Sequence, residues 1–417
     1  MTAPRPPVPE QAAPSAEPSA AGRKHAGTAL EVLGAFLRLG LTSFGGPVAH
    51  LGYFRTEFVQ RRRWLDDRSY SDLVALCQFL PGPASSQVGI ALGLSRAGAW
   101  GALAAWFGFT LPSAAALILF AYGVAHDGRW ANSGAVHGLK VVAVAVVAQA
   151  VWGMARSLCP DRPRAGLAIF AALATLVLPS AFGQIGAIVL CGLIGWLLLR
   201  LPHQQPAPHI SHGVSRRAGI AAFALFVLLL AGLPLLAAAS GSPFWALMGG
   251  FYRAGALVFG GGHVVLPLLQ AAVVPSGAVS NADFLAGYGA AQAVPGPLFT
   301  FAAYLGAVMD GPFPAWVRAL VFLAAIFLPA FLLVAAALPF WDALRQRDGV
   351  QSALAGVNAG VVGILLSALY DPVWTGAIHT RADFGLALAA FGLLAYARMS
   401  PVLVVALAAA GGWALQA

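Results

Sequence analysis

Two stretches of similar sequence each place a glutamine just before a Pro-Gly-Pro break inside an apolar segment. The first covers residues 78–83 (QFLPGP) and the second covers residues 292–297 (QAVPGP). Upstream of each lies an arginine followed by a Phe-Gly-Gly motif, and Arg38 and Arg253 stand about 215 residues apart. Helices interrupted at equivalent positions of two repeats indicate the binding site of a transporter. The chemistry that these residues predict is therefore reversible binding of a substrate.

The recurrence of these motifs in register shows that the chain is a duplication. The first Phe-Gly-Gly motif is Phe44-Gly45-Gly46, and the second covers residues 259–261. A Leu-Pro pair follows each Pro-Gly-Pro motif, at residues 111–112 and 328–329, where it predicts a later kink. Each half therefore contains the same sequence of apolar segments.

Composition places these segments in a membrane. The chain has 417 residues, of which 59% are hydrophobic and only 9% are charged, whereas about 25% charged residues is typical of soluble domains. Apolar runs of near-spanning length predict an all-α polytopic membrane protein. The net charge is +9, and most arginines lie in loops, where they set topology and meet anionic lipid. No nucleic-acid partner is therefore expected. The three cysteines have no metal-binding spacing, and no cofactor is expected.

The order of segments predicts two inverted-topology repeats with broken or re-entrant helices, in about 10–13 membrane segments. The predicted parts are a disordered tail (1–27), a first repeat (28–200), a cytoplasmic linker (201–217), an extra transmembrane helix (218–239) and a second repeat (240–417). The extra helix has no counterpart in the first half. One added crossing turns the second repeat upside down.

The first two segments of each half are expected to form a re-entrant pair. A loop with five arginines follows segment 30–54 and is expected in the cytoplasm, where positive loops accumulate. If segment 30–54 crossed the membrane from a cytoplasmic tail, this loop would lie on the wrong side. A pair of segments that enters to the glycine or proline break and returns avoids this conflict, provided that the break lines an enclosed cavity.

With these motifs in place, the chain resembles the chromate transporter family in its long two-domain form. The resemblance rests on the doubled Phe-Gly-Gly motif, the doubled Pro-Gly-Pro motif preceded by glutamine, and the Leu-Pro pair, and it covers roughly residues 30–200 and 244–416. It implies export of chromate from the cytoplasm, with sulfate as a related anion. The second repeat departs from the first: Gly262-His263 replaces Pro47-Val48, and residues 298–300 (LFT) replace residues 84–86 (ASS). The two halves are therefore not expected to be equivalent at the site.

A tetrahedral dianion of this kind needs hydrogen-bond donors and positive potential. Helix N-termini supply free N–H groups and about half a positive charge, and glycines let the backbone approach an anion closely. Proline suits the first turn of a helix, so each Pro-Gly-Pro break can start a new half-helix. The predicted substrate-binding residues are Arg38, Phe44, Gly45, Gly46, Gln78, Pro81, Gly82, Pro83, Ser85 and Ser86 in the first repeat, and Arg253, Phe259, Gly260, Gly261, Gln292, Pro295, Gly296, Pro297 and Thr300 in the second.

Each of these assignments has a structural alternative. The breaks could serve helix packing, where small residues allow close approach, and the two arginines could reach the membrane surface along their aliphatic stems. His50 and His263 are candidates for proton coupling because imidazole titrates near physiological pH, and Lys140 is a third candidate within an apolar segment.

Two classes of function follow. The first is a secondary transporter that moves chromate across the inner (cytoplasmic) membrane, with efflux that confers chromate resistance, or a transporter of sulfate or another oxyanion. The second is a non-transporting membrane protein, such as a scaffold or a lipid-site enzyme. No Gly-Lys-Ser/Thr phosphate loop is present, which disfavours direct drive by ATP, and no cluster of residues indicates an enzyme. The expected partners are the oxyanion and membrane lipid, and the sequence leaves a homodimer open.

Overall fold

A computed structural model of the chain describes residues 27–44, 46–126, 134–178, 181–199, 214–259, 262–341 and 348–416. In this part of the chain the regular structure is helical, with no β-strand, which confirms the predicted all-α class. Residues 1–26 of the predicted tail and most of the predicted linker lie outside the described ranges.

The first repeat comprises α1 (Ala29–Thr42), α2 (Gly46–Phe54), the π-helical turn η1 (Arg55–Arg61), α3 (Asp67–Phe79), α4 (Ala84–His126), α6 (Gly134–Leu158), α7 (Arg162–Val177) and α8 (Ala181–Leu198). The unpaired helix is α9 (Arg216–Ser240). The second repeat comprises α10 (Pro243–Leu257), η2 (Gly262–Val264), α11 (Val265–Val273), α12 (Asn281–Ala293), η3 (Leu298–Thr300), α13 (Phe301–Val308), α14 (Ala315–Ala337), η4 (Leu338–Phe340), α16 (Asp348–Ala368), η5 (Leu369–Trp374), α17 (Thr375–Ala377), α18 (Arg381–Ala395) and α19 (Pro401–Gln416).

Both predicted breaks occur in both repeats. Between α1 and α2 the chain leaves the helix at Ser43, and between α3 and α4 it is non-helical through the Pro-Gly-Pro motif. In the second repeat the corresponding breaks follow α10 and α12. Helix α4 also turns sharply at Ala97 and Gly98, so it is two helices joined by a non-helical link. The sequence predicts a later kink at Pro112 and Pro329. The backbone of α4 and α14 keeps helical angles at both prolines.

Five helices of the described chain are long and apolar enough to cross a membrane: α4, α6, α9, α14 with η4, and α16 with its extension. Shorter apolar helices such as α8 and α19 accompany them. Helix α9 is the least buried of the five, as expected for a helix that faces lipid. These features support a multi-pass membrane protein, and the predicted count of about 10–13 segments includes helices too short for a simple crossing.

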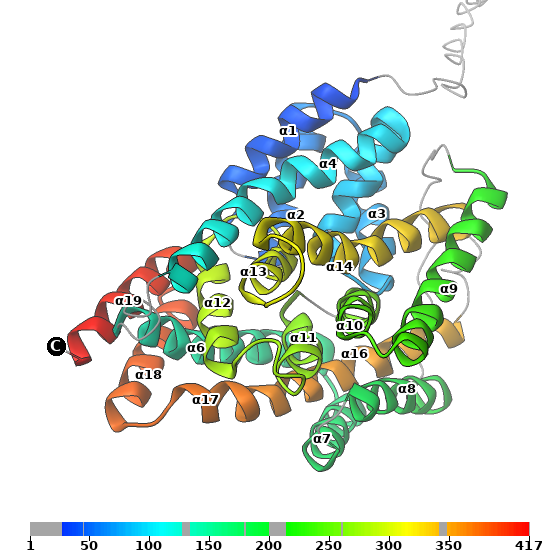
Figure 1. The fold of residues 1–417 in the computed structure, drawn as a ribbon. Helices are drawn as coiled ribbons and strands as arrows, with labels where there is room; N and C mark the ends of the chain where they lie inside the picture. The colour runs from blue at the N-terminus through cyan, green and yellow to red at the C-terminus, as the bar shows by residue number, and fades with distance from the viewer. Residues whose placement is uncertain are drawn as a thin grey trace, which may run out of the picture.

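The two repeats interlock through the equivalent helices α6 and α16. Helix α6 of the first repeat packs against α18 and α19 of the second, and α16 of the second packs against α7 and α8 of the first (Figure 1). The contacts are reciprocal in detail: Gly138 lies against the carbonyl of Ala408, and Gly356 lies against the carbonyl of Cys191, with no room for a Cβ at either glycine. This exchange confirms that the duplication extends to the tertiary structure, whereas the inverted orientation of the repeats stays a prediction.

The apolar core divides into two main parts on either side of the breaks. One gathers α1, α3 and the first turns of α4 with α10 and α14, around Phe36, Phe54, Phe58 and Phe109. The other gathers α6, α7 and α8 with most of the second repeat. Each part mixes helices from both repeats, so neither half buries its apolar surface without the other.

Candidate substrate-binding site

The Pro-Gly-Pro break of each repeat is hydrogen-bonded to the Phe-Gly-Gly region of the other repeat. Gly82 donates its backbone N–H to the carbonyl of Val258 at 2.6 Å, and Gly296 donates to the carbonyl of Ser43 at 2.9 Å. Both glycines have positive φ angles, +123° and +106°, which side chains rarely adopt. The four breaks, far apart in the sequence, therefore meet crosswise at the middle of the molecule.

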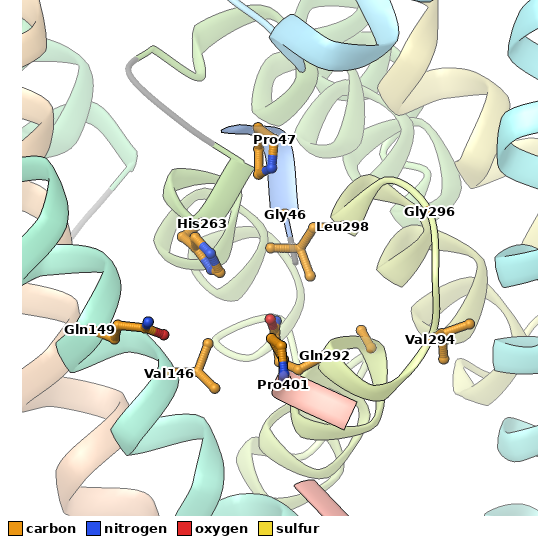
Figure 2. Close-up of a pocket in the computed structure, with 11 residues that line it drawn as sticks. Gly46, Pro47, Val146, Gln149, His263, Gln292, Val294, Gly296, Leu298 and Pro401 are labelled. Atoms are coloured by element: carbon orange, nitrogen blue, oxygen red, sulfur yellow. The ribbon is translucent and has the colours of Figure 1, made fainter. Parts of the chain in front are cut away.

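Two cavities adjoin this meeting point. The larger has a volume of about 860 Å³, and its lining includes Gln78 and Gly82 of the first repeat and Gly262 of the second. The smaller has a volume of about 70 Å³ and is lined by Gln292 and Gly296, among others (Figure 2). Gly46, Pro47, Gln149 and His263 line both cavities, and we call this shared lining the wall between them.

The first residues of four helices line these cavities. Gly46 and Pro47 begin α2, Ala84 begins α4, Gly262 begins η2, and Leu298 begins η3. The N-terminus of a helix carries unpaired N–H groups and a partial positive charge. Among the described residues that line the two cavities none is acidic, and Arg156 is the charged one. The arrangement is suited to hold an anion by backbone and neutral side-chain donors.

Several predicted side chains are buried beside the breaks rather than in the cavity walls. His50 lies on α2 with Nδ1 3.4 Å from the hydroxyl of Ser85 in the first turn of α4. Ser86 is buried next to it in the sequence, and Thr300 donates its hydroxyl to the carbonyl of Pro297 at 2.7 Å. These contacts fix the entry of the chain into each half-helix.

The two repeats differ in polarity at equivalent positions, as the sequence predicts. Among the buried side chains of the first repeat with a polar atom that has no hydrogen-bond partner in the described residues are Ser43, His50, Ser86 and Thr110. The second repeat carries Val258, Val265, Thr300 and Phe327 at the equivalent positions. At these four positions the first repeat is the more polar, although Gln292 at the break of the second repeat also has an unpaired buried Nε2. Unpaired buried polar atoms require a water or a ligand.

The predicted residues fall into four groups. Those that line the two cavities are Gly46, Gln78, Gly82, His263, Gln292 and Gly296. Those buried or half-buried beside them on the same breaks are Phe44, His50, Pro81, Pro83, Ser85, Ser86, Phe259, Pro295, Pro297 and Thr300. Those on the described helices that line neither cavity are Arg38, Lys140 and Arg253. Gly45, Gly260 and Gly261 lie outside the described residues.

The three cations of the third group occupy other surroundings. Arg38 is exposed on α1, where its charge interacts with Glu57. Arg253 is half-buried on α10 in a small separate cavity beside Gly250 and Leu268. Lys140 is half-buried on α6 and interacts with the charge of Asp283. The structure therefore does not bring these side chains to the meeting point of the breaks.

The arginine-rich loop after α2 is held by acidic partners. Arg55 forms an ion pair with Asp67 at 2.6 Å, and Glu57 accepts hydrogen bonds from Arg61 and Arg62. The hydrogen bond from Arg55 lowers the pKa of Asp67. Burial raises the pKa of Glu57, but the hydrogen bond and charge of Arg62 outweigh it, so the net direction is down. Both carboxylates stay ionised at neutral pH and offset part of the positive charge of the loop.

Two amide side chains of the cavity walls are among the lining residues that were not predicted as site residues. Gln149 on α6 interrupts an apolar run, and Asn358 on α16 stands where the first repeat has Lys140. Single polar residues within apolar helices are the signal that could have indicated them. That signal does not say whether such a residue faces a cavity or a neighbouring helix.

Comparison with known proteins agrees with the doubled motifs. The model of the chromate transporter family matches residues 30–196 and again residues 245–413. A chromate transport protein of Pseudomonas aeruginosa is 29% identical over 393 residues, which cover 91% of this chain and 90% of that protein.

Two further relatives span most of the chain. A chromate transport protein of Cupriavidus metallidurans is 26% identical over 380 residues, covering 88% of this chain and 87% of the relative. An uncharacterized transporter of Methanocaldococcus jannaschii is 24% identical over 344 residues, covering 82% and 83%. No solved structure matches the chain significantly. Because the family model covers both repeats and the motifs that meet at the cavities, the chain belongs to the chromate transporter family.

Proposed function

We propose that this protein is a secondary transporter that exports chromate across the cytoplasmic membrane and so confers chromate resistance. The observation that carries the proposal is the convergence of four helix N-termini on two adjoining cavities whose described lining has no acidic residue. Chromate is a tetrahedral dianion, and backbone N–H groups at helix starts are suited to such an ion. Family membership and the names of the two relatives called chromate transport proteins support chromate as the substrate.

The shared lining of the two cavities suits a transport cycle. The larger cavity reaches Arg156 and Ser157 at the end of α6, and the smaller one reaches Pro401 at the start of α19. They share the wall formed by Gly46, Pro47, Gln149 and His263. Opening this wall to one cavity and then to the other would carry an ion past it, which is the alternating access of secondary transporters.

Sulfate is the second candidate substrate, because its shape and charge match those of chromate. Backbone donors recognise a tetrahedral oxyanion by geometry and charge, and nothing in the lining distinguishes a chromium centre from a sulfur centre. Chromate and sulfate therefore compete for one site in this proposal.

The test uses everted membrane vesicles that contain the full chain, with vesicles lacking it as control. Labelled chromate should accumulate in the everted vesicles when a pH or voltage gradient is imposed, and accumulation should stop when the gradient is collapsed. Sulfate should inhibit it. Equal accumulation in the control vesicles would contradict transport, and accumulation of sulfate with none of chromate would favour the second candidate.

A further inference from the structure

The wall between the two cavities contains few polar side chains. Of the four residues that line both cavities, Gly46 and Pro47 contribute backbone, and Gln149 and His263 contribute polar side-chain atoms. His263 uses one ring nitrogen, because its Nδ1 lies 2.7 Å from the hydroxyl of Tyr288. Figure 2 shows the side chains of Gln149 and His263 at the smaller cavity, and both residues also line the larger one.

The amide of Gln149 has hydrogen-bonding capacity to spare. Its Nε2 donates to the carbonyl of Leu394 on α18 over 3.3 Å, a long bond that uses one of its two N–H groups. No other hydrogen bond of this side chain is formed within the described ranges. One N–H group is thus free to bind a ligand.

A second amide reaches the larger cavity from the equivalent helix of the other repeat. Asn358 lies on α16, and its Oδ1 is buried without a hydrogen-bond partner among the described residues. Rotation of this amide by half a turn presents its N–H groups in place of the oxygen. A buried amide with an unpaired atom in a cavity wall costs stability unless a ligand or water completes it.

We propose that Gln149 and Asn358 are substrate-binding residues that hold the transported oxyanion through uncharged N–H donors. This inference rests on the proposed function. An amide donates to a dianion without forming an ion pair, so the ion is held firmly enough to enter and weakly enough to leave. An arginine at either position would trap the ion, and a carboxylate would repel it in proportion to the charge of the ion.

That proportionality provides the test. Glutamate has nearly the shape of glutamine, so Gln149→Glu adds a negative charge with little change in packing. By Coulomb's law its repulsion of a dianion is twice its repulsion of a monoanion at the same place. Sulfate and perchlorate are tetrahedral oxyanions that carry two charges and one charge, and they are therefore the probes.

The experiment measures binding of labelled chromate to the purified full chain in detergent and its displacement by sulfate and by perchlorate. In Gln149→Glu and in Asn358→Asp, the loss of affinity for sulfate, expressed as a logarithm, should be about twice the loss for perchlorate. Gln149→Met removes the donor without adding charge, and chromate binding should weaken roughly 10- to 100-fold. Gln60→Glu, which places the same charge on the exposed surface of η1, is the matched control and should bind as the wild type does.

Each outcome decides between the two proposals. Equal losses for sulfate and perchlorate, or chromate binding within threefold of the wild type in all three cavity variants, would overturn the role of the amides and leave the proposed function intact. Failure of the wild type itself to bind chromate or sulfate would overturn the proposed function and this inference with it. Thermal unfolding of each variant separates a loss of binding from a loss of folded protein, and only binding per folded molecule is compared.

Discussion

At the scale of single residues, Gly46 combines an unusual backbone angle with a place in the shared cavity wall. Its φ of +81° lies in the left-handed region, and a Cβ built on it would meet open space. Gly46→Val should therefore impose a strain of about 1–2 kcal/mol and place a branched side chain in the path of the anion. We expect the variant to insert and fold but to lose chromate binding, measured per folded molecule after size-exclusion chromatography.

Gly52 is the matched control for this substitution. It lies on the same short helix, is exposed, lines neither cavity and also has open space around its Cβ position. Gly52→Val should retain chromate binding. If Gly46→Val bound chromate normally and only its yield fell, the Phe-Gly-Gly break would serve packing instead of binding.

Arg156 is the charged residue among the described residues that line the cavities. It lies in the last turn of α6, over the ring of Trp152. An exposed cation at a cavity mouth raises the local concentration of an anion, and salt screens this effect. Arg156→Gln should lower the initial rate of chromate uptake roughly two- to fivefold at low ionic strength. The difference from the wild type should vanish at high salt.

Arg162 provides the comparison for Arg156, because it is exposed nearby and lines neither cavity. Arg162→Gln should leave the uptake rate unchanged at both ionic strengths. A deficit of Arg156→Gln that persisted at high salt would mean that the side chain binds the ion directly or supports the structure, and would contradict a steering role.

At the scale of elements, the exchanged helices α6 and α16 depend on glycines where they cross their partners. Gly356 on α16 lies against the backbone of α8, with no space for a Cβ. Gly356→Val should separate the two helices and cost about 1–3 kcal/mol, as overpacking of interiors does. The expected result is a lower melting temperature and a lower folded yield, read by thermal unfolding in detergent.

Gly385 on α18 gives the corresponding control, because it is exposed and a Cβ there would meet nothing. Gly385→Val should melt close to the wild type. Because α16 also carries Asn358, any Gly356→Val protein that does fold should bind chromate more weakly. Unchanged stability of Gly356→Val would contradict a tight crossing of α16 and α8 at this glycine.

At the scale of the whole molecule, the predicted topology follows from the positive loops and the unpaired helix α9. The amino terminus and linker 201–217 should be cytoplasmic, and the carboxyl terminus should be periplasmic. Reporter fusions after Ala417 and within the linker measure the side of each directly. Reporters on the same side would contradict inverted repeats, whereas opposite sides would support the role of α9 as the added crossing.

The sequence by itself determined the features that short segments encode. Pro-Gly-Pro and Phe-Gly-Gly accompany a helix break in both repeats, because proline lacks an N–H and glycine permits φ angles that side chains exclude. The breaks, the duplication, the polytopic all-helical class and the family could therefore be predicted from residues 30–200 and 244–416. The re-entrant path, the direction of transport and the coupling role of His50 and His263 stay predictions.

Only the tertiary structure decided which residues meet. The hydrogen bonds from Gly82 to Val258 and from Gly296 to Ser43 each join a residue of one repeat to a residue of the other. Whether a polar residue within an apolar helix faces a cavity or a surface depends on the rotation of that helix against distant partners, and successive residues differ by about 100° around the axis. Arg38 and Arg253 were the stronger candidates from the sequence because each is a repeated charge in an apolar segment, but they lie away from the breaks. Gln149 and Asn358 are single neutral residues that the sequence did not single out, and they line the larger cavity.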